Sequence, residues 1–234
     1  MELLTSLLWL KETDSTQNRL KEWNLGYGSV VVADRQTAGR GRLGRKWLSQ
    51  EGGLYFSFLL NPKEFKDLIQ LPLVLGLSLS ESLEELGIKT QIKWVNDLYL
   101  NRKKVAGILC ELCGEKLIVG IGINVNQREI PEEIKDRATS LLIETGREFD
   151  RKEVLLRFFE RAKENLKTFK EAGFSPFKKK IEDRLLFVGE DVRILGPQEF
   201  KGKLIGLSER GGALLLTERG LMEFISGELS LRPL

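Results

Sequence analysis

Runs of hydrophobic residues alternate with polar, glycine-containing segments along most of the chain. In the first half these runs are short and bounded by turn-forming residues, which is typical of strands. They predict strands at residues 7–10, 30–34, 53–60, 92–95, 98–100, 104–112 and 116–126. The last two lie at hairpin spacing around Gly114 and Glu115. Strands that follow one another in this way favour an antiparallel or mixed sheet with helices packed on one face.

Helices are predicted where start signals precede longer amphipathic or apolar segments. Asp14 and Asp150 are each followed three residues later by Gln or Glu, the spacing of a capping box. Asn61-Pro62 is another start pair, and Pro72 opens an apolar segment that ends before Gly87. The signals predict helices at residues 14–23, 72–86, 150–172 and 175–184. Together with the strands they indicate an α+β fold.

The pattern changes near residues 187–190. Beyond Gly189 the apolar runs are short and separated by glycine-containing turns, at Gly196-Pro197, Gly202, Gly211-Gly212, Gly220 and Gly227. Evenly spaced turn signals of this kind indicate a small all-β barrel of about 45 residues. We therefore expect a larger domain at residues 1–187 and a smaller one at 188–234.

Composition excludes several classes of function. The chain has 234 residues, of which 41% are hydrophobic and 30% charged, with a net charge of +3. That charge is too small to indicate nucleic-acid binding by itself. The sequence contains no histidine, which excludes Ser-His-Asp and Cys-His catalysis and His-ligated zinc. No apolar run approaches the ~20 residues that span a membrane, and the N-terminus lacks signal-peptide features, so we expect a cytoplasmic protein.

The two cysteines, Cys110 and Cys113, form a C-x-x-C pattern that could indicate redox chemistry or metal binding. Their surroundings read as a strand, in which residues three apart point to opposite faces. No second cysteine pair is present to complete a zinc site. We expect a structural role, because a free cysteine packs as a small hydrophobic side chain.

The most distinctive motif is the loop at residues 39–47. It combines three glycines, four cations and Trp47 in nine residues. Glycine permits close approach of the backbone to a ligand, and arginine binds carboxylate and phosphate oxygens, so we expect an anionic ligand there. A solvated loop, an RNA contact and a dinucleotide fingerprint are alternatives. The fingerprint requires a following helix, whereas a strand is predicted next, so a Rossmann site is disfavoured.

Two further groups of polar residues lie where an ordinary core would not place them. Ser15 and Thr16 begin the first helix, and Gln36 stands at the entrance of the loop. The second group is the segment 93–97 together with Lys104, which precedes a strand containing Gly107. Each also has an ordinary interpretation, as first-turn residues, a turn pair or a strand-end lysine. None of these signals is specific alone.

In combination the motifs closely resemble those of the biotin protein ligase family. The matching segments are Asp14-Ser15-Thr16, Gln36, the loop 39–47, Lys93-Trp94-x-Asn96-Asp97, Lys104-x-Ala106-Gly107-Ile108, Gly120-x-Gly122-Ile123-Asn124 and Ala138-Thr139-Ser140-Leu141. The resemblance implies a catalytic domain of the class II synthetase-like type and a C-terminal SH3-like barrel. It also implies biotin and ATP as substrates, with Mg²⁺, and a biotin carboxyl carrier protein as acceptor.

The resemblance assigns roles to individual residues of this chain. Those expected to bind biotin are Ser15, Thr16, Gln36, Gly39, Arg40, Lys104, Gly107, Gly120 and Gly122. Those expected to bind ATP are Arg40, Arg42, Arg45, Trp47, Asn96, Lys104 and Asn124. The expected catalytic residues are Lys104, Arg40, Arg42 and Asp97, and Asp97 is also a candidate metal ligand.

The sequence departs from the family pattern at two places. Val95 stands where the family usually has proline, which should alter the rigidity of the turn that presents Asn96 and Asp97. Only about six residues precede the first predicted strand, which leaves no room for the helix-turn-helix of some relatives, so we expect no DNA binding. Homodimers occur in the family, and a homodimer is possible here.

Two other functions remain as alternatives. A lipoate or octanoate protein ligase would share the fold and a lysine like Lys104, but those relatives carry an Arg-Arg-x-Ser-Gly-Gly-Gly motif in place of the loop 39–47. A nucleic-acid-binding module would use the loop and the barrel as a basic surface, and its binding would depend steeply on salt.

Overall fold

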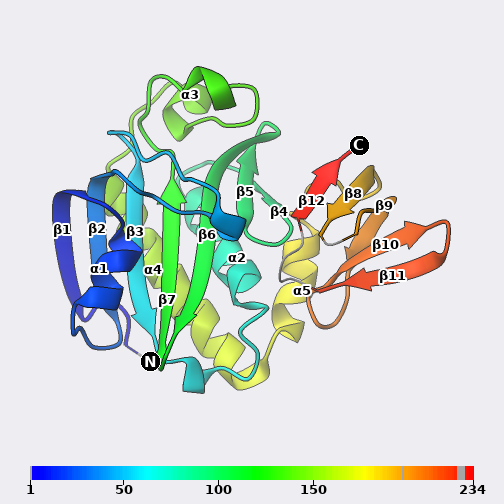
Figure 1. Cartoon of the computed structure of the whole chain (residues 1–234), viewed down its shortest axis with the longest axis horizontal. Coiled ribbons are helices and arrows are strands. Elements are labelled where there is room, and N and C mark those ends of the chain that lie inside the picture. The colour runs from blue at the N-terminus through cyan, green and yellow to red at the C-terminus, as the bar shows by residue number, and fades with distance from the viewer. Residues whose placement is uncertain (1, 197, 226–229) are drawn as a thin grey trace.

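The computed structural model describes residues 2–196, 198–225 and 230–234. A seven-stranded sheet occupies its larger part, with the strands in the order β1-β2-β3-β7-β6-β5-β4 (Figure 1). The strands are β1 (Ser6–Thr13), β2 (Ser29–Gln36), β3 (Leu54–Leu60), β4 (Gln91–Lys93), β5 (Asp97–Leu100), β6 (Lys103–Cys113) and β7 (Lys116–Ile123). Only the β1–β2 pair is parallel, which confirms the predicted mixed, largely antiparallel sheet.

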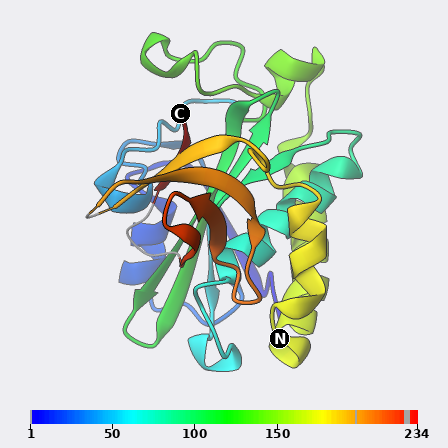
Figure 2. The ribbon, with the colours of Figure 1, turned by 90° about the vertical axis from the view of Figure 1, so that its right-hand side faces the viewer.

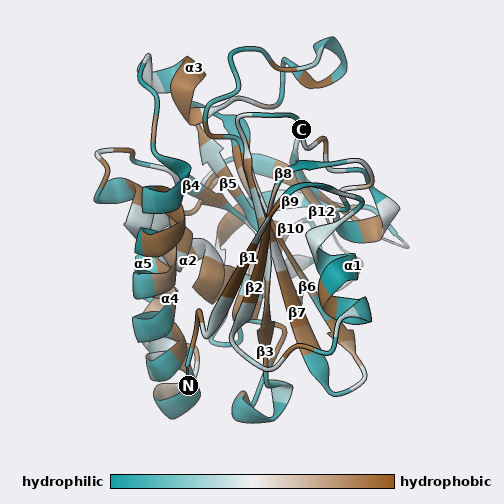
Figure 3. Ribbon diagram, turned by 90° about the vertical axis from the view of Figure 1, so that its left-hand side faces the viewer, coloured by the Kyte–Doolittle hydropathy of each residue, from teal (hydrophilic) through white to brown (hydrophobic). Residues whose placement is uncertain are grey.

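The helices α2 (Leu71–Glu84) and α4 (Arg151–Ala172) cover one face of this sheet, and α5 (Ser175–Glu182) packs against both helices. Almost all of α2 is buried between the sheet and α4. The amphipathic α4 directs Phe158 and Phe159 onto Phe56 and Phe58 of β3, with ring centroids 5.3–6.1 Å apart. In Figure 3 the central strands are mostly brown and the outer surface of α4 mostly teal, in agreement with this arrangement.

The opposite face carries α1 (Thr16–Glu22), so the expectation of helices on one face only was wrong. Leu20 of α1 packs there with Val31, Leu59 and Ile118, in a second and smaller core. The sheet is therefore apolar on both faces at β2, β3 and β7. This placement directs the beginning of α1 towards the residues of the candidate site.

The predicted capping box at Asp14 was also wrong. The N-cap of α1 is Ser15 and has no side-chain cap. Asp14 instead accepts a hydrogen bond from Asn18 at 2.7 Å and pairs with Arg19 at 3.0 Å. At Asp150 the cap is present, although its carboxylate accepts from the backbone N–H of Lys152. Asn61 caps only a 3₁₀ turn, η2 (Pro62–Glu64).

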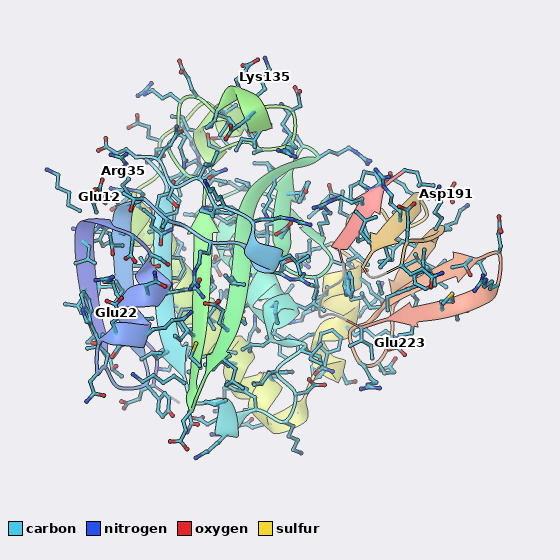
Figure 4. The ribbon with its side chains drawn as sticks, in the orientation of Figure 1. Glu12, Glu22, Arg35, Lys135, Asp191 and Glu223 are labelled. Atoms are coloured by element: carbon cyan, nitrogen blue, oxygen red, sulfur yellow. The ribbon has the colours of Figure 1, made fainter. Side chains whose placement is uncertain are left out.

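The remaining short elements are α3 (Leu141–Thr145) and the 3₁₀ turns η1 (Arg42–Gly44) and η3 (Glu132–Ile134). Charged side chains project from the outer surfaces. Figure 4 shows Glu12 and Arg35 close together at the β1–β2 edge, where they pair at 3.2 Å. None of the described helices combines the length and apolar character needed to cross a membrane.

A second sheet is formed by the C-terminal strands, which lie in front in Figure 2. They are β8 (Asp191–Leu195), β9 (Phe200–Leu207), β10 (Ala213–Thr217), β11 (Gly220–Phe224) and β12 (Ser230–Pro233), in the order β11-β10-β9-β8-β12. In the described part of the chain no pairing joins β11 to β12. The predicted all-β character of this part of the chain is observed, but closure into a barrel is not observed in the described residues. Turns were also predicted at Gly196-Pro197 and at Gly227, but residues 197 and 227 lie outside the described residues.

The two sheets share one hydrophobic core, which includes residues of β8–β10 as well as of α2 and β3. Trp94, which follows β4, donates from Nε1 to the carbonyl of Gly211 at 3.0 Å. Glu182 of α5 accepts from the backbone N–H of Leu207 at 2.8 Å. These contacts bring the end of β12 to the wall of the cleft described next.

Candidate active site

A cleft lies beside the N-terminal end of α1, across strands β3, β7, β6, β5 and β4. It encloses about 900 Å³, part of it open to solvent, and its walls include the loop 39–47 and the end of β12. Most of the residues predicted from the sequence line it: Ser15, Thr16, Gln36, Arg40, Arg42, Arg45, Trp47, Asn96, Asp97, Lys104, Gly107, Gly120 and Gly122. Segments far apart in the sequence therefore meet at one place, as predicted.

The two exceptions are Gly39 and Asn124, which do not line the cleft. A Cβ at Gly39 would lie 2.5 Å from the carbonyl oxygen of Trp47, so this glycine permits the loop to close on itself. The side chain of Asn124 is buried, donates to the carbonyl of Thr139 at 2.9 Å and accepts from Gln127 at 3.3 Å. Their expected roles in ligand binding stay predictions.

One end of the cleft is closed by buried hydroxyl and amide groups. Thr16 donates from its backbone N–H to Oε1 of Gln36 at 2.8 Å, and its hydroxyl lies 2.7 Å from that of Ser57. Gln36 in turn donates to Ser49 at 2.9 Å. These hydrogen bonds fix the orientation of each donor and acceptor, so this end suits a neutral polar group such as a urea.

The floor is made of glycines on paired strands. Gly107 of β6 and Gly122 of β7 are direct partners. A Cβ at Gly107 would lie 3.0 Å from the Trp47 ring, and one at Gly122 would lie 2.5 Å from it. The indole of Trp47 therefore lies flat on a surface that only glycine provides. Its Nε1 is buried and has no hydrogen-bond partner among the described residues, which leaves a donor for a ligand.

The other end of the cleft is strongly cationic. Seven Lys and Arg residues line the cleft, against a single carboxylate, that of Asp97. Arg42 donates to Asn96 at 3.0 Å, and Asn96 donates to the carbonyl of Ile108 at 2.9 Å. Burial lowers the pKa of Arg42 from its usual value, while Asp97 opposes this change. Such a concentration of positive charge in one cleft indicates a polyanionic ligand.

Arg40 is held by a contact outside this cationic group. Its Nη2 lies 2.8 Å from Oε2 of Glu111 on β6, and Lys21 of α1 reaches the same oxygen at 3.1 Å. The Nε of Arg40 is buried without a partner among the described residues. Glu111 therefore holds the outer edge of this guanidinium, and its Nε–H is left for a ligand.

Lys104 is positioned by both its side chain and its backbone. Its ammonium pairs with Asp97 at 2.6 Å and lies 5.1 Å from the centroid of the Trp47 ring. Its backbone exchanges hydrogen bonds with Arg137 and Thr139, each at 2.9 Å. The Ala138-Thr139 segment noted in the sequence therefore supports Lys104 rather than the cleft itself.

The role of Asp97 as a metal ligand stays a prediction. Within the described part of the chain, Asp97 is the one carboxylate on the cleft wall, and it pairs with Lys104. Within residues 2–196, 198–225 and 230–234 there is no group of three or more His, Cys, Asp or Glu side chains that could hold a metal ion. We therefore derive no step through a protein-bound metal.

The turn before Asn96 contains the unusual Val95. The Trp94–Val95 peptide bond is cis, and the Val95 side chain is buried in the main core. Cys110 and Cys113 are both free, and they pack against the main and the smaller core respectively, on opposite faces as predicted. Burial raises the pKa of the Cys110 thiol to about 12, in line with a structural role.

Among the cleft residues, Gln17 and Arg232 were not singled out from the sequence, and Lys93 was noted only as part of the segment 93–97, without a binding role. Gln17 reaches across Gly120, whose Cβ would lie 2.7 Å from its Cδ, and donates to the carbonyl of Leu109. Lys93 lies inside a motif that was recognised, but in an apolar run that predicted only a strand. Arg232 comes from the second sheet, and no local pattern could have placed it here.

With this geometry in view, the comparisons with known proteins identify the family. Residues 9–127 match the biotin/lipoate A/B protein ligase family. This chain belongs to that family. Its sequence is 38% identical to the bifunctional ligase/repressor BirA of Bacillus subtilis (strain 168), over 95% of this chain and 72% of that protein.

Two other members of this ligase family are similar over nearly their whole length. The biotin–[acetyl-CoA-carboxylase] ligase of Paracoccus denitrificans is 33% identical over 88% of this chain and 92% of its own. The structure of a biotin protein ligase from Aquifex aeolicus in complex with biotin and ATP has a TM-score of 0.96 and 67% identity. That similarity covers 98% of this chain and 100% of the Aquifex chain.

Proposed function

We propose that this chain is a biotin protein ligase, which activates biotin with ATP and transfers it to a lysine of a biotin carboxyl carrier protein. One observation carries the proposal. A single cleft joins a closed, neutral hydrogen-bonding end to a cationic end, across a glycine floor that an aromatic ring covers. The family relationship agrees with this assignment.

The first step joins two anions. An oxygen of the biotin carboxylate attacks the α-phosphorus of ATP, the bond to the bridging oxygen of pyrophosphate breaks, and biotinyl-5′-AMP forms. Fixed cations reduce the repulsion between carboxylate and polyphosphate, and they stabilise the charge that develops in the transition state. We assign this role to Lys104 and Arg40, with Arg42 and Arg45 beside them. ATP would enter as its magnesium salt, because the protein offers no metal site of its own in the described residues.

The closed end of the cleft would bind the ureido ring of biotin. The hydroxyls of Ser15 and Thr16 and the amide of Gln36 can match its carbonyl and N–H groups. The glycines at 107, 120 and 122 are covered by Trp47 and Gln17 in this structure, and the flat part of the ligand would contact these side chains. Trp47 would lie against the adenine, which an indole ring stacks on well. Asn96 and Asn124 are the proposed amide contacts of the nucleotide.

The second step requires a neutral amine. The ε-amino group of the carrier lysine attacks the acyl carbon, the bond to the AMP oxygen breaks, and one proton leaves the nitrogen. An unperturbed lysine of pKa ~10.4 is neutral in only about one molecule in 2,500 at pH 7. Among the described residues that line the cleft, Asp97 is the only one with a carboxylate, so we propose that it orients or deprotonates the incoming lysine.

The larger-scale assignments belong to the same proposal. Residues 1–187 would form the catalytic domain and residues 188–234 a small domain of the SH3-like type, which the separate five-stranded sheet supports. A homodimer could use the free edge of β1, where Leu7 and Leu8 are exposed. Equilibrium sedimentation would detect such a dimer.

The proposal is tested by biotin-dependent exchange of labelled pyrophosphate into ATP. We expect exchange with biotin and no exchange with lipoate or octanoate, because the closed end matches a ureido group. Exchange that depended on lipoate would support the other branch of the family. Absence of exchange with every acid would contradict the proposed first step.

A further inference from the structure

Glu111 is a charged side chain beside the cleft to which the proposed reaction gives no role. It lies on β6 two residues beyond Leu109, and alternate residues of a strand share one face of the sheet. Gly107 and Leu109 line the cleft, so Glu111 is the next residue of the same row. On the other face, Ile108 and Cys110 pack with the main core. The carboxylate therefore lies on the cleft side of the sheet, where it is only 26% exposed.

Two cations from different elements share this carboxylate. Arg40 of the loop 39–47 donates from Nη2 to Oε2 of Glu111 at 2.8 Å. The ammonium of Lys21, which belongs to α1, lies 3.1 Å from the same oxygen. Glu111 thus joins α1, β6 and the loop at one point. Without its charge, Arg40 and Lys21 would be two neighbouring like charges and would repel each other.

The contact with Glu111 fixes the direction of the whole guanidinium of Arg40. The group is planar, so an anchored Nη2 also sets where the other N–H groups point. Arg40 lines the cleft, and its Nε is buried without a partner among the described residues. A buried donor without a partner is costly unless a ligand accepts its hydrogen bond. One part of the guanidinium is therefore held by the protein, and another remains for an anion.

We propose that Glu111 is a positioning residue, which holds Arg40 in the orientation that retains the acyl-adenylate between the two steps. This inference rests on the proposed function of the cleft and extends it to a residue beside the cleft wall. After pyrophosphate has left, the adenylate carries a single phosphate charge, so each aligned cation matters more for its retention. Alignment of the guanidinium before binding lowers the side-chain entropy that is lost when the anion binds.

The test is the rate at which chemically prepared biotinyl-5′-AMP dissociates from the whole chain. Added adenylate is used so that a slow first step in a variant does not limit the measurement. Glu111→Gln keeps the size of the side chain and removes its charge, whereas Lys21→Met removes only the second cation. The matched control is Glu115→Gln, because Glu115 lies between β6 and β7 and pairs with Lys63 at 2.8 Å in an exposed ion pair.

We expect the adenylate to leave Glu111→Gln about fivefold faster than wild type, as for the loss of a charge-assisted hydrogen bond in a partly exposed pair. Lys21→Met and Glu115→Gln should release it at the wild-type rate. Adenosine, which carries no phosphate, should bind all four proteins equally. An unchanged rate in Glu111→Gln would overturn the assignment, and so would an equal change in Lys21→Met.

A double-mutant cycle distinguishes positioning from a general structural effect. Arg40→Met removes the guanidinium, so the further change Glu111→Gln should leave the dissociation rate of that variant as it is. Independent effects of the two substitutions would show that Glu111 acts by another route, and they would contradict the proposal.

The proposed function fails by a different result, which is the absence of biotin-dependent pyrophosphate exchange in the wild-type protein. Hydrogen exchange without ligands decides the role of Glu111 separately. Residues 39–47 should exchange faster in Glu111→Gln than in wild type and in Glu115→Gln. Equal exchange in all three proteins would show that Glu111 does not hold Arg40, whatever the cleft binds.

Discussion

At the scale of single residues, the ion pair between Asp97 and Lys104 is the main feature of the cleft. Their ion pair is 2.6 Å long, and the exposed fractions of the two side chains are 14% and 27%. Lys104 would contact the reacting carboxylate, while Asp97 would meet the carrier lysine. The pair thus connects the groups proposed for the two steps.

Asp97→Asn should separate these steps. The amide keeps the size of the side chain but cannot accept a proton at neutral pH, so we expect transfer to the carrier to slow by about tenfold or more. Adenylate formation should fall less, because Lys104 keeps its charge. Single-turnover assays of each step would measure this, and equal rates to wild type in both steps would refute the role of Asp97.

A second prediction concerns the contribution of Lys93 to the pH dependence of the free energy of unfolding. The pKa of Lys93 is about 7 in the folded protein, chiefly because of burial, and 10.5 in the unfolded chain. Between these two pH values the unfolded chain therefore binds more protons than the folded protein. The free energy of unfolding therefore rises with pH above 7, by at most about 1.4 kcal/mol per pH unit from this group. Below pH 7 both states carry the proton, and the contribution no longer changes.

Denaturant titrations from pH 6 to pH 9 would check this prediction. Subtracting the unfolding free energy of Lys93→Met from that of wild type cancels the contributions of the other titrating groups. We expect that difference to change in favour of wild type as the pH rises from 7 to 9. A difference that is constant with pH would show that Lys93 is not buried in the way described.

The sequence predicted site residues best where a motif contained side chains suited to a particular kind of ligand. Arg40, Trp47 and Lys104 were expected at the site, and all three line the cleft. Lys93 was noted within the polar segment 93–97 but was given no binding role, because a strand pattern does not say which face meets a cleft. Arg232 is more than 120 residues from Lys104 in the sequence, and only tertiary packing brings it there.

At the scale of elements, the loop 39–47 is held in one conformation by several contacts. Its ends are joined by the hydrogen bond from Trp47 N–H to the carbonyl of Gly39 at 2.9 Å, and Gly41 donates to Arg45 at 2.7 Å. Leu43 has a positive φ of 58°, a conformation that non-glycine residues adopt at a cost. The contacts of Trp47 with the floor and of Arg40 with Glu111 hold this conformation.

Gly122→Ala should release the loop. The added Cβ would lie 2.5 Å from the Trp47 ring, so the indole must move off the floor. We expect faster hydrogen exchange in residues 39–47 and weaker ATP binding, by several-fold or more. Gly26→Ala is the control, because no atom lies within 4 Å of a Cβ there. Exchange in the loop that matched the control would show that Trp47 does not hold it.

Ligands should have the reverse effect on the wild-type loop. An acyl-phosphate is easily hydrolysed, so the loop must exclude water while the adenylate is bound. We expect biotin with ATP to slow hydrogen exchange in residues 39–47. The loop was recognisable from its composition, but its conformation depends on Gly107, Gly122 and Glu111, which come from other strands.

At the scale of the whole molecule, two sheets share a core and form one cleft. The sequence predicted two domains from the change of pattern near Gly189; it placed the strands of the larger sheet to within a few residues, and for the smaller sheet it predicted only an all-β character. It could not predict the Trp94–Gly211 hydrogen bond, because that contact depends on how the sheets pack. It also overestimated the closure of the second sheet, since turn spacing predicts strands but not which strands pair last.

The most direct test of the account is to incubate the protein with biotin, Mg·ATP and a biotin carboxyl carrier domain, and then to weigh the carrier. We predict a mass increase of one biotinyl group on a single lysine, which requires both biotin and ATP. A carrier that stays unmodified, while a biotin ligase of known activity modifies it under the same conditions, would contradict the account.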